Sequence, residues 1–335
     1  MQSIIHFIIS MHASTPTPVQ SLFTYATADR GGKRATLFLE RMEALVPWED
    51  AAEGLTPEIY ATTGRPGFPV VTLLKCLFLA QWYGLSDPEL EDQIRDRLSF
   101  QRFLGITEVR DIPDETTLCR FRNKLIPFGG AVELFHCVQD LIDDHGVRVK
   151  RGRIIDATII DAPKGRKRSD GTSTRDPDAG FTKKHGKSYH GYKHHLQTDT
   201  KGRFIEQIVT TSAQPHDSTV FDELIRGEEH AIFADSAYVS ANRRRQFRRD
   251  GVYDGVIDKA YRNHPLSEKQ RALNRKKSSV RCRGEHPIAW MKGLMRHRRV
   301  RYRGLVKNTA HGLLVAAAYN LKRLMSVLAR SPAFT

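Results

Sequence analysis

Three acidic residues occupy positions where a carboxylate can do chemistry. Asp156 interrupts the apolar, β-branched run RIIDATII, Asp235 directly follows the apolar run AIFA, and Glu285 opens a helical segment. A carboxylate inside or at the end of a buried strand is unfavourable unless a cation compensates its charge. Carboxylate oxygens are the ligands that hard divalent ions prefer. The three acids are therefore candidate ligands for Mg²⁺ if the fold brings them together.

A pair of Mg²⁺ ions in such a site activates an attacking oxygen and stabilises the leaving oxygen of a phosphodiester. Because like charges repel, at least one of the carboxylates keeps its proton longer when no metal is bound. Simpler interpretations exist: each aspartate as a turn cap, and Glu285 as a solvated charge at a helix start. Asp161 is a rival acid, but it lies five positions after Asp156 and faces the other side of the strand. In a basic chain, the metal interpretation indicates a nuclease or strand transferase.

The composition indicates a polyanionic partner. The chain has 335 residues, a formal net charge of +15 and an isoelectric point of about 9.8. This balance favours nucleic acid first and an anionic membrane surface second. The apolar run at residues 4–9 is too short to span a membrane, and Met11 is an alternative start. The four cysteines form no CxxC pair, so we expect reduced thiols in a cytoplasmic protein.

Helical patterns dominate the first half of the chain. Residues 1–33 carry little periodicity and are predicted to be flexible, and an all-α N-terminal domain is predicted over 34–148. Within this domain a nearly continuous apolar run predicts a buried helix, and Ser86 with Glu89 forms a capping box that starts the next helix. The predicted helices are 69–83, 86–97, 114–125 and 131–145.

Alternating strands and helices over residues 149–330 predict an α/β domain, a mixed sheet flanked by helices. We expect strands at 153–161, 191–198, 203–211, 230–235 and 252–258, and helices at 218–226, 240–249, 285–296 and 307–328. Residues 164–187 are predicted to be a mobile loop, and residues 271–283 a basic connector. Neighbouring parallel strands present their acids at one edge, so Asp156 and Asp235 can meet there.

Basic side chains gather in several runs, and such runs neutralise phosphates and make binding steeply salt-dependent. Arg120, Arg122 and Lys124 are expected on the exposed side of a helix that could enter a major groove in helix-turn-helix fashion. The simpler interpretation of any single run is a solvated surface. Histidines also cluster loosely, but no spacing closes a zinc site; the residues concerned are His185, His190, His194, His195 and His216. His194 or His195, and His216, could instead line the active site and contact phosphate.

These motifs resemble a known family. From about residue 34 to residue 328 the chain is similar to bacterial insertion-sequence transposases of the DDE class, specifically the group typified by insertion sequence five. The similar motifs are GRPGFP, YGLSD and PDETT in the helical part, DATII and ADSAY around the two aspartates, and RYRGLVKN near the end. Arg281, Glu285 and Lys292 match the arginine, glutamate and lysine spacing of the family signature. That signature begins with a tyrosine three positions before the arginine, where this chain has Ser278.

The resemblance implies a ribonuclease H-like catalytic fold in which Asp156, Asp235 and Glu285 hold two Mg²⁺ ions, with Mn²⁺ able to substitute. It implies binding to the terminal inverted repeats, cleavage at the element ends, and joining of the 3′-hydroxyl to target DNA. The protein would act as a homodimer on double-stranded DNA, near the nucleoid and without a membrane. Lys292 would contact a phosphate, and Arg281 would position DNA or the Glu285 carboxylate. The remaining predicted DNA contacts are Arg120, Arg122, Lys124, Arg298, Arg299, Arg301 and Arg303.

Two other functions stay open at this level. A non-catalytic DNA-binding or regulatory protein could keep the transposase fold, although the presence of all three acids favours an enzyme. A nuclease acting on RNA–DNA hybrids would use the same catalytic fold, but it would not need the helical first half.

Overall fold

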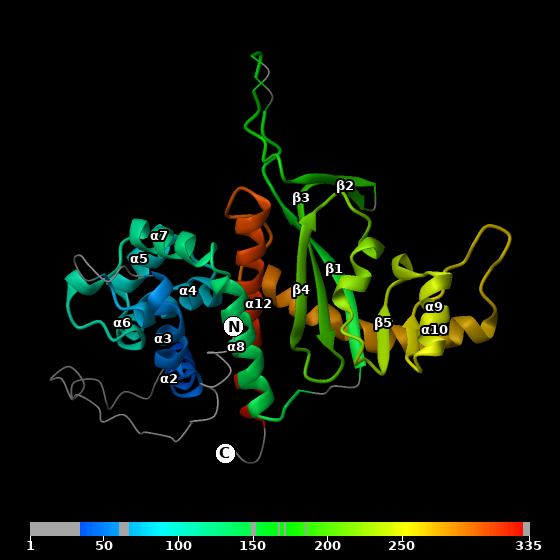
Figure 1. Ribbon diagram of the computed structural model, residues 1–335, viewed down its shortest axis with the longest axis horizontal. Helices are drawn as coiled ribbons and strands as arrows, with labels where there is room; N and C mark the ends of the chain where they lie inside the picture. The colour runs from blue at the N-terminus through cyan, green and yellow to red at the C-terminus, as the bar shows by residue number, and fades with distance from the viewer. Residues whose placement is uncertain are drawn as a thin grey trace. The chain divides into compact units, whose positions relative to one another are not determined.

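The computed structural model describes residues 34–59, 67–148, 152–166, 168–170, 172–184 and 186–330 (Figure 1). The predicted flexible segment at 1–33, with Met11, lies outside the described residues. Residues 39–335 form one compact unit, and the contacts described here lie within it. The predicted domain limits at residues 33/34 and 148/149 stay a prediction.

The first part of this unit is helical, as predicted. The helix α4 (Val70–Tyr83) is buried at every position except Val71 and Tyr83, because its apolar residues run around the whole helix. Ser86 and Glu89 form the predicted capping box, which starts α5 (Asp87–Asp96). The other elements are α2 (Arg34–Leu45), α3 (Trp48–Ile59), α6 (Leu98–Leu104), η2 (Val109–Asp111), α7 (Glu115–Leu125) and α8 (Gly130–Asp144).

The second part is the predicted mixed sheet. Its strands are β1 (Gly152–Asp161), β2 (Gly180–Lys184), β3 (Lys187–Asp199), β4 (Ile205–Ser212), β5 (Ala231–Ala234) and β6 (Tyr253–Val256). The strand order is β2-β3-β1-β5-β6, with β4 also paired to β3. The pairs of β3 with β1, β2 and β4 are antiparallel, whereas β1, β5 and β6 are parallel.

Helices cover both faces of this sheet. They are α9 (Ala241–Arg249), α10 (Glu268–Arg281), α11 (Glu285–Lys292) and α12 (Leu305–Leu328), with short 3-10 turns η3 (Asp217–Thr219), η4 (Phe221–Leu224), η5 (Ser236–Tyr238) and η6 (Cys282–Gly284). Successive residues of β1 point to opposite faces. Ile155 packs with Phe221 and Phe247 on the α9 side. Ile154 meets Gly284 on the other side, where a Cβ at Gly284 would lie 2.6 Å from Ile154 Cγ2. Glycine at this position therefore lets the α10–α11 segment approach β1 closely.

The helix α12 joins the helical part to the sheet, because it packs against α4, α8 and β4 (Figure 1). Trp82 Nε1 of α4 donates to the carbonyl oxygen of Ala318, at 2.9 Å. The buried Asn320 amide bonds both the N–H and the C=O of Ile205, each at 2.8 Å. The helical part and the sheet thus share one buried helix.

Four sequence predictions are corrected by the structure. The predicted connector at 271–283 is mostly the helix α10, which starts at a capping box of Ser267 and Gln270. Its many lysines and arginines leave little apolar periodicity to reveal a helix. The predicted loop at 164–187 contains the strand β2, which forms because β3 extends far enough to pair with it. The predicted helix at 218–226 is two short 3-10 turns, and the one at 285–296 ends at Lys292, just before Gly293.

Among the described residues, no single helix has the length and apolar character needed to cross a membrane. Two consecutive helical segments, Val109–Leu125 and Gly130–Asp144, are together long and apolar enough to span a membrane, but the chain bends by 82° between them.

Candidate active site

The sheet register brings the two aspartates to neighbouring positions. In the parallel pair of β1 and β5, Ile154 lies opposite Phe233. Two residues further along each strand are Asp156 and Asp235, and adjacent strands are about 4.8 Å apart. Asp156 Oδ1 accepts a hydrogen bond from the N–H of Ala157, at 2.8 Å. Asp235 follows the end of β5, whereas Asp156 lies in the middle of β1, and the parallel register brings the two acids to neighbouring positions.

Asp235 also caps the 3-10 turn η5 that follows it. Its Oδ1 accepts a hydrogen bond from the N–H of Ala237, at 2.6 Å. The turn-cap interpretation of this aspartate is therefore correct. It does not exclude a role as a ligand, because this bond occupies only one of the two carboxylate oxygens.

Arg281 connects Asp156 to the glutamate. Arg281 ends α10, and Glu285 begins α11 four residues later, so the two lie on the same helical face. The Arg281 guanidinium places Nη1 at 3.3 Å from Asp156 Oδ2 and Nη2 at 2.7 Å from Glu285 Oε1. One cation thus bridges two acids that are far apart in the sequence.

The two bridged acids differ in their surroundings. Burial raises the pKa of the Asp156 carboxyl above its ordinary value, and the nearby Asp235 raises it further. The Ala157 N–H and the Arg281 charge act in the opposite direction. The side chain of Asp156 is 20% exposed, whereas that of Glu285 is 59% exposed. Asp156 is therefore the acid that most needs a neighbouring cation, and Glu285 is the acid most open to solvent.

Lys292 lies seven residues, or about two helical turns, after Glu285. Burial lowers the pKa of the Lys292 ammonium group; the Asp161 carboxylate opposes this, and the Lys184 and Arg298 charges add to it. Lys184 on β2 also lowers the pKa of Asp156. Lys184 was not singled out in the sequence, because the only available signal was a basic stretch predicted to be a loop.

The acids fit a hard divalent ion by their chemistry. Their free donors are carboxylate oxygens, and the Arg281 guanidinium already shows that a positive charge is favoured between Asp156 and Glu285. As they stand in the described part of the chain, no three acidic, histidine or cysteine side chains are grouped closely enough to hold a metal ion. Binding of a metal by Asp156, Asp235 and Glu285 together therefore requires their side chains to move closer together.

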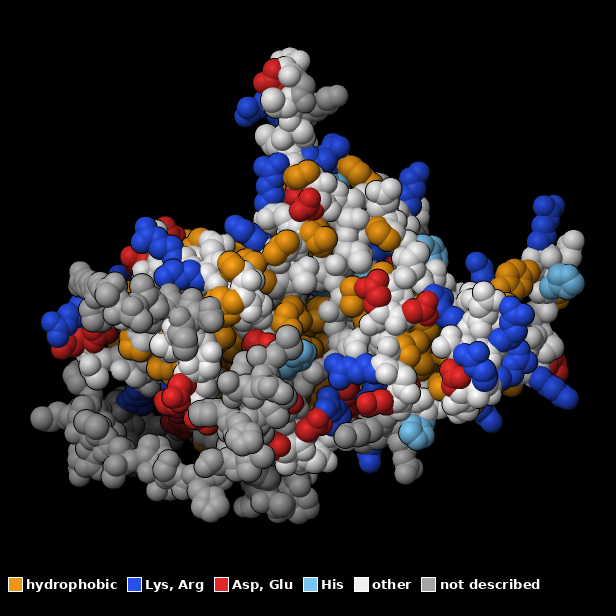
Figure 2. All heavy atoms as spheres, viewed as in Figure 1, with side chains coloured by type: hydrophobic (Ala, Val, Ile, Leu, Met, Phe, Trp, Pro, Cys, Tyr) orange, Lys and Arg blue, Asp and Glu red, His pale blue; other side chains and the backbone are white. Residues whose placement is uncertain are grey.

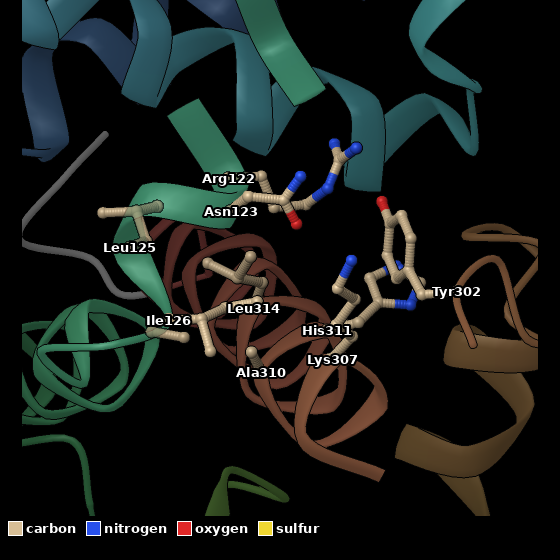
Figure 3. A pocket seen from close by; sticks show the side chains of 10 residues that line it. Arg122, Asn123, Leu125, Ile126, Tyr302, Lys307, Ala310, His311 and Leu314 are labelled. Atoms are coloured by element: carbon tan, nitrogen blue, oxygen red, sulfur yellow. The ribbon is translucent and has the colours of Figure 1, made fainter. Parts of the chain in front are cut away.

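Arg122 does not lie on the exposed face predicted for it. It is buried, and it forms two hydrogen bonds with the Asp87 carboxylate, at 2.9 and 2.6 Å. Its guanidinium carbon lies 4.6 Å from the centre of the Tyr302 ring. Arg122, Tyr302 and His311 line a small pocket (Figure 3). Its volume is about 10 Å³. Arg122 therefore holds the helical part against the segment before α12, whereas Arg120 and Lys124 are exposed as expected.

Several predicted DNA contacts near the end of the chain bond to the protein backbone. Arg298 Nε donates to the carbonyl oxygen of Lys292 at 2.9 Å, and Arg301 donates to that of Leu85. Arg303 Nη2 donates to the carbonyl oxygen of Arg175, at 2.8 Å. The exposed Arg299 pairs through its backbone with Asp161 at the end of β1, in an isolated parallel β-bridge. DNA contacts by these four arginines stay a prediction.

A strongly basic surface covers α9 and α10 (Figure 2). Of the α9 arginines, Arg243 pairs with Asp222, and Arg244 pairs with Asp254 and Asp258. The exposed cations of the two helices are Arg245, Arg248, Arg249, Lys269, Arg271, Arg275 and Lys276.

Of the loosely clustered histidines, His190, His194 and His195 are buried, and the described residues form no zinc cluster. His185 lies outside the described residues. His194 Nδ1 bonds Thr210 Oγ1 at 2.9 Å, and His194 Nε2 lies 2.8 Å from His297 Nε2. Burial lowers the pKa of His194 to about 3, so its ring is neutral. This pair lies between the sheet and α12, and His216 is exposed and bonds Ser218.

The sheet order, its mixture of parallel and antiparallel pairs, and the helices on both faces define a ribonuclease H-like fold. An acid stands on its first strand and another follows β5. Two protein-family models match the chain: Transposase DDE domain over residues 148–321, and Transposase domain (DUF772) over residues 28–124. The chain therefore belongs to the DDE transposases of insertion sequences, enzymes of mobile elements that act on DNA. Members of this family generally use divalent metal ions.

Proposed function

We propose that this transposase cleaves DNA at the ends of its element and joins the freed 3′-hydroxyl to target DNA, using Asp156, Asp235 and Glu285. The observation that carries the proposal is the junction of β1, β5 and α11. There Asp156 on β1 and Asp235 just after β5 each lie two residues beyond the paired Ile154 and Phe233, and Arg281 bridges Asp156 to Glu285. We place the chain in the group typified by insertion sequence five on the motifs that it shares with that group.

The three carboxylates would hold the divalent ions, two Mg²⁺ with Mn²⁺ able to substitute. When bound, such ions supply positive charge that activates an attacking oxygen and stabilises a leaving oxygen of a phosphodiester. Asp156 and Asp235 are rigid donors, because each has Oδ1 fixed by a backbone N–H. Glu285 is more exposed and comes from a helix, so it is the donor best able to rotate into place.

Arg281 and Lys292 would serve the same site in different ways. Arg281 neutralises Asp156 and Glu285. With a divalent ion held by these carboxylates, its guanidinium would be able to bind a phosphate instead. Lys292 follows Glu285 on the same helix and would contact a phosphate near the cleaved bond. The bound DNA would be the terminal inverted repeats, held by a homodimer, and then the target duplex.

The test is cleavage of a duplex that carries the element end, with and without Mg²⁺. Asp156→Asn, Asp235→Asn and Glu285→Gln each remove a carboxylate without changing the side-chain size, and Asp161→Asn is the matched control. We expect the three variants to lose cleavage and keep binding, and the control to keep both. Cleavage by any of the three would remove that residue from the site. Binding without cleavage by the unmodified chain would favour the non-catalytic alternative.

A further inference from the structure

A narrow, basic projection rises from the sheet immediately after β1. The described residues 164–166 and 168 leave the end of β1, and residues 172–175 return beside them as the second arm of a two-stranded ribbon (Figure 1). Its two arms pair by backbone hydrogen bonds, from Arg168 N to Thr172 O at 2.8 Å and from Thr174 N to Arg166 O at 3.1 Å. The Asp170 carboxylate bonds the Thr172 N–H near the end of the ribbon, at 2.8 Å. We call residues 164–175 the basic finger.

The base of the basic finger is firmly attached. Arg175 Nε donates to the carbonyl oxygen of Lys164, at 2.8 Å, which closes the two arms. The next residue, Asp176, is buried, and its Oδ2 accepts bonds from Tyr192 Oη at 2.7 Å and from Gly304 N at 2.9 Å. Because Tyr192 belongs to β3 and Gly304 precedes α12, the finger starts from the rigid part of the fold.

The composition of the basic finger gives it no role in the core. It contains no aliphatic or aromatic residue, and its one acid is Asp170. Its cations are Lys164, Arg166, Lys167, Arg168 and Arg175. Arg166 and Arg168 are exposed on the described arms. A projection this polar cannot be maintained by apolar burial, and its charge favours a polyanionic partner.

We propose that the basic finger enters the major groove of the DNA duplex that flanks the cleaved bond. A major groove is about 12 Å wide and admits a two-stranded β-ribbon in undistorted DNA, whereas a minor groove, about 6 Å wide, admits one only after the DNA is deformed to widen it. The deep, narrow major groove of an RNA helix excludes such a ribbon. Duplex DNA is therefore the partner that fits both the charge and the shape.

The distance along β1 from Asp156 to the strand end, just before the finger, corresponds to about half a turn of DNA. Asp156 and Asp161 are five residues apart on β1, which corresponds to about 17 Å of strand. At about 3.4 Å per base pair, this is about five base pairs, or half a helical turn. This position rests on the proposed function, because it assumes that the cleaved phosphate lies beside Asp156. The groove contact itself does not depend on catalysis.

The finger variant Arg166→Gln/Arg168→Gln tests the proposal against a control of equal charge, Arg110→Gln/Arg330→Gln. Arg110 and Arg330 are exposed cations outside the finger. Binding of the element-end duplex is measured over a range of salt in EDTA, so that no cleavage occurs. Loss of two phosphate contacts should reduce the slope of log K against log salt by about 1.8. When the salt concentration is raised fourfold, the finger variant should therefore lose about twelvefold less affinity than the unmodified chain loses. An unchanged slope, or an equal change in the control, would overturn the proposal.

Dimethyl sulfate footprinting gives a second, independent readout, because it reports guanine N7 in the major groove. We expect protection about half a turn from the cleaved bond, present in the unmodified chain and in Asp235→Asn but lost in the finger variant. Protection that persists without the finger arginines would refute the groove contact. A finger variant that binds DNA normally but changes the oligomeric state in sedimentation would replace DNA with a second copy as the partner. Failure of the proposed catalytic site would instead appear as retained cleavage in Asp235→Asn, with these footprints unchanged.

Discussion

Replacing Arg281 with methionine should destabilise the metal-free protein in a way that depends on pH. The guanidinium contacts Asp156 at 3.3 Å and Glu285 at 2.7 Å, and the two carboxylates differ in exposure. Breaking a fully buried ion pair costs about 3–5 kcal/mol, whereas an exposed pair contributes about 0–1 kcal/mol. Asp156 is mostly buried but keeps its hydrogen bond from Ala157 N. We therefore expect Arg281→Met to lower the free energy of unfolding by about 2 kcal/mol.

The pH dependence follows from the raised pKa of Asp156. Above that pKa the carboxylate is ionised, and losing Arg281 leaves a buried charge beside Asp235. As the pH falls through that pKa, the carboxyl becomes neutral and needs no cation. The difference in free energy of unfolding between Arg281→Met and the unmodified chain should therefore be largest at neutral pH and disappear in acid.

The assay is thermal unfolding at several pH values, with and without Mg²⁺. The double variant Arg281→Met/Asp156→Asn should regain most of the lost stability at neutral pH, because the uncompensated charge is gone. Mg²⁺ should stabilise Arg281→Met more than the unmodified chain, because the ion no longer competes with the guanidinium. A loss of stability that is the same at every pH and persists in the double variant would refute the reasoning.

Three further outcomes follow from other contacts. Lys292 should lose its charge at a lower pH than an ordinary lysine, because burial lowers its pKa. As the pH is raised, the DNA affinity of the unmodified chain should therefore fall before that of Lys292→Arg, whose guanidinium stays charged. Binding titrations at a series of pH values measure this difference. Asn320→Ala should cost about 2–4 kcal/mol in urea unfolding, because both backbone groups of Ile205 lose their partner, whereas the exposed Asn242→Ala should cost little. The folded-state pKa of His194 is lowered to about 3, below its ordinary value, so stability should be lost as the pH falls from about 6.5 toward 3. His194→Gln should make that fall shallower by about 1.4 kcal/mol per pH unit.

Much of the local structure followed from short stretches of sequence. The apolar run of α4, the capping box at Ser86 and the strand around Asp156 were all predicted, because each depends on neighbours along the chain. The helix α10 was missed because its surface is basic nearly all round. Its start at Ser267 had a local signal, a capping box, that the prediction did not use.

Contacts between distant segments decided the rest. The Arg122 side chain was expected in solvent because it lies in a basic helix, and it is buried because Asp87 and Tyr302 come to meet it. The strand β2 exists because β3 is long enough to pair with it, and that pairing fixes the position of Lys184, whose charge lowers the pKa of Asp156.

By itself, the sequence determined which three carboxylates could do chemistry and the type of element that carries each of them, because strand, turn and helix preferences are local. Only the tertiary structure decided that Arg281 lies between Asp156 and Glu285, and that a basic finger is anchored at the end of β1. The physical reason is that both features depend on sheet register and on the packing of α10, α11 and α12. These arrangements join residues more than one hundred positions apart, and no periodicity along the chain encodes them.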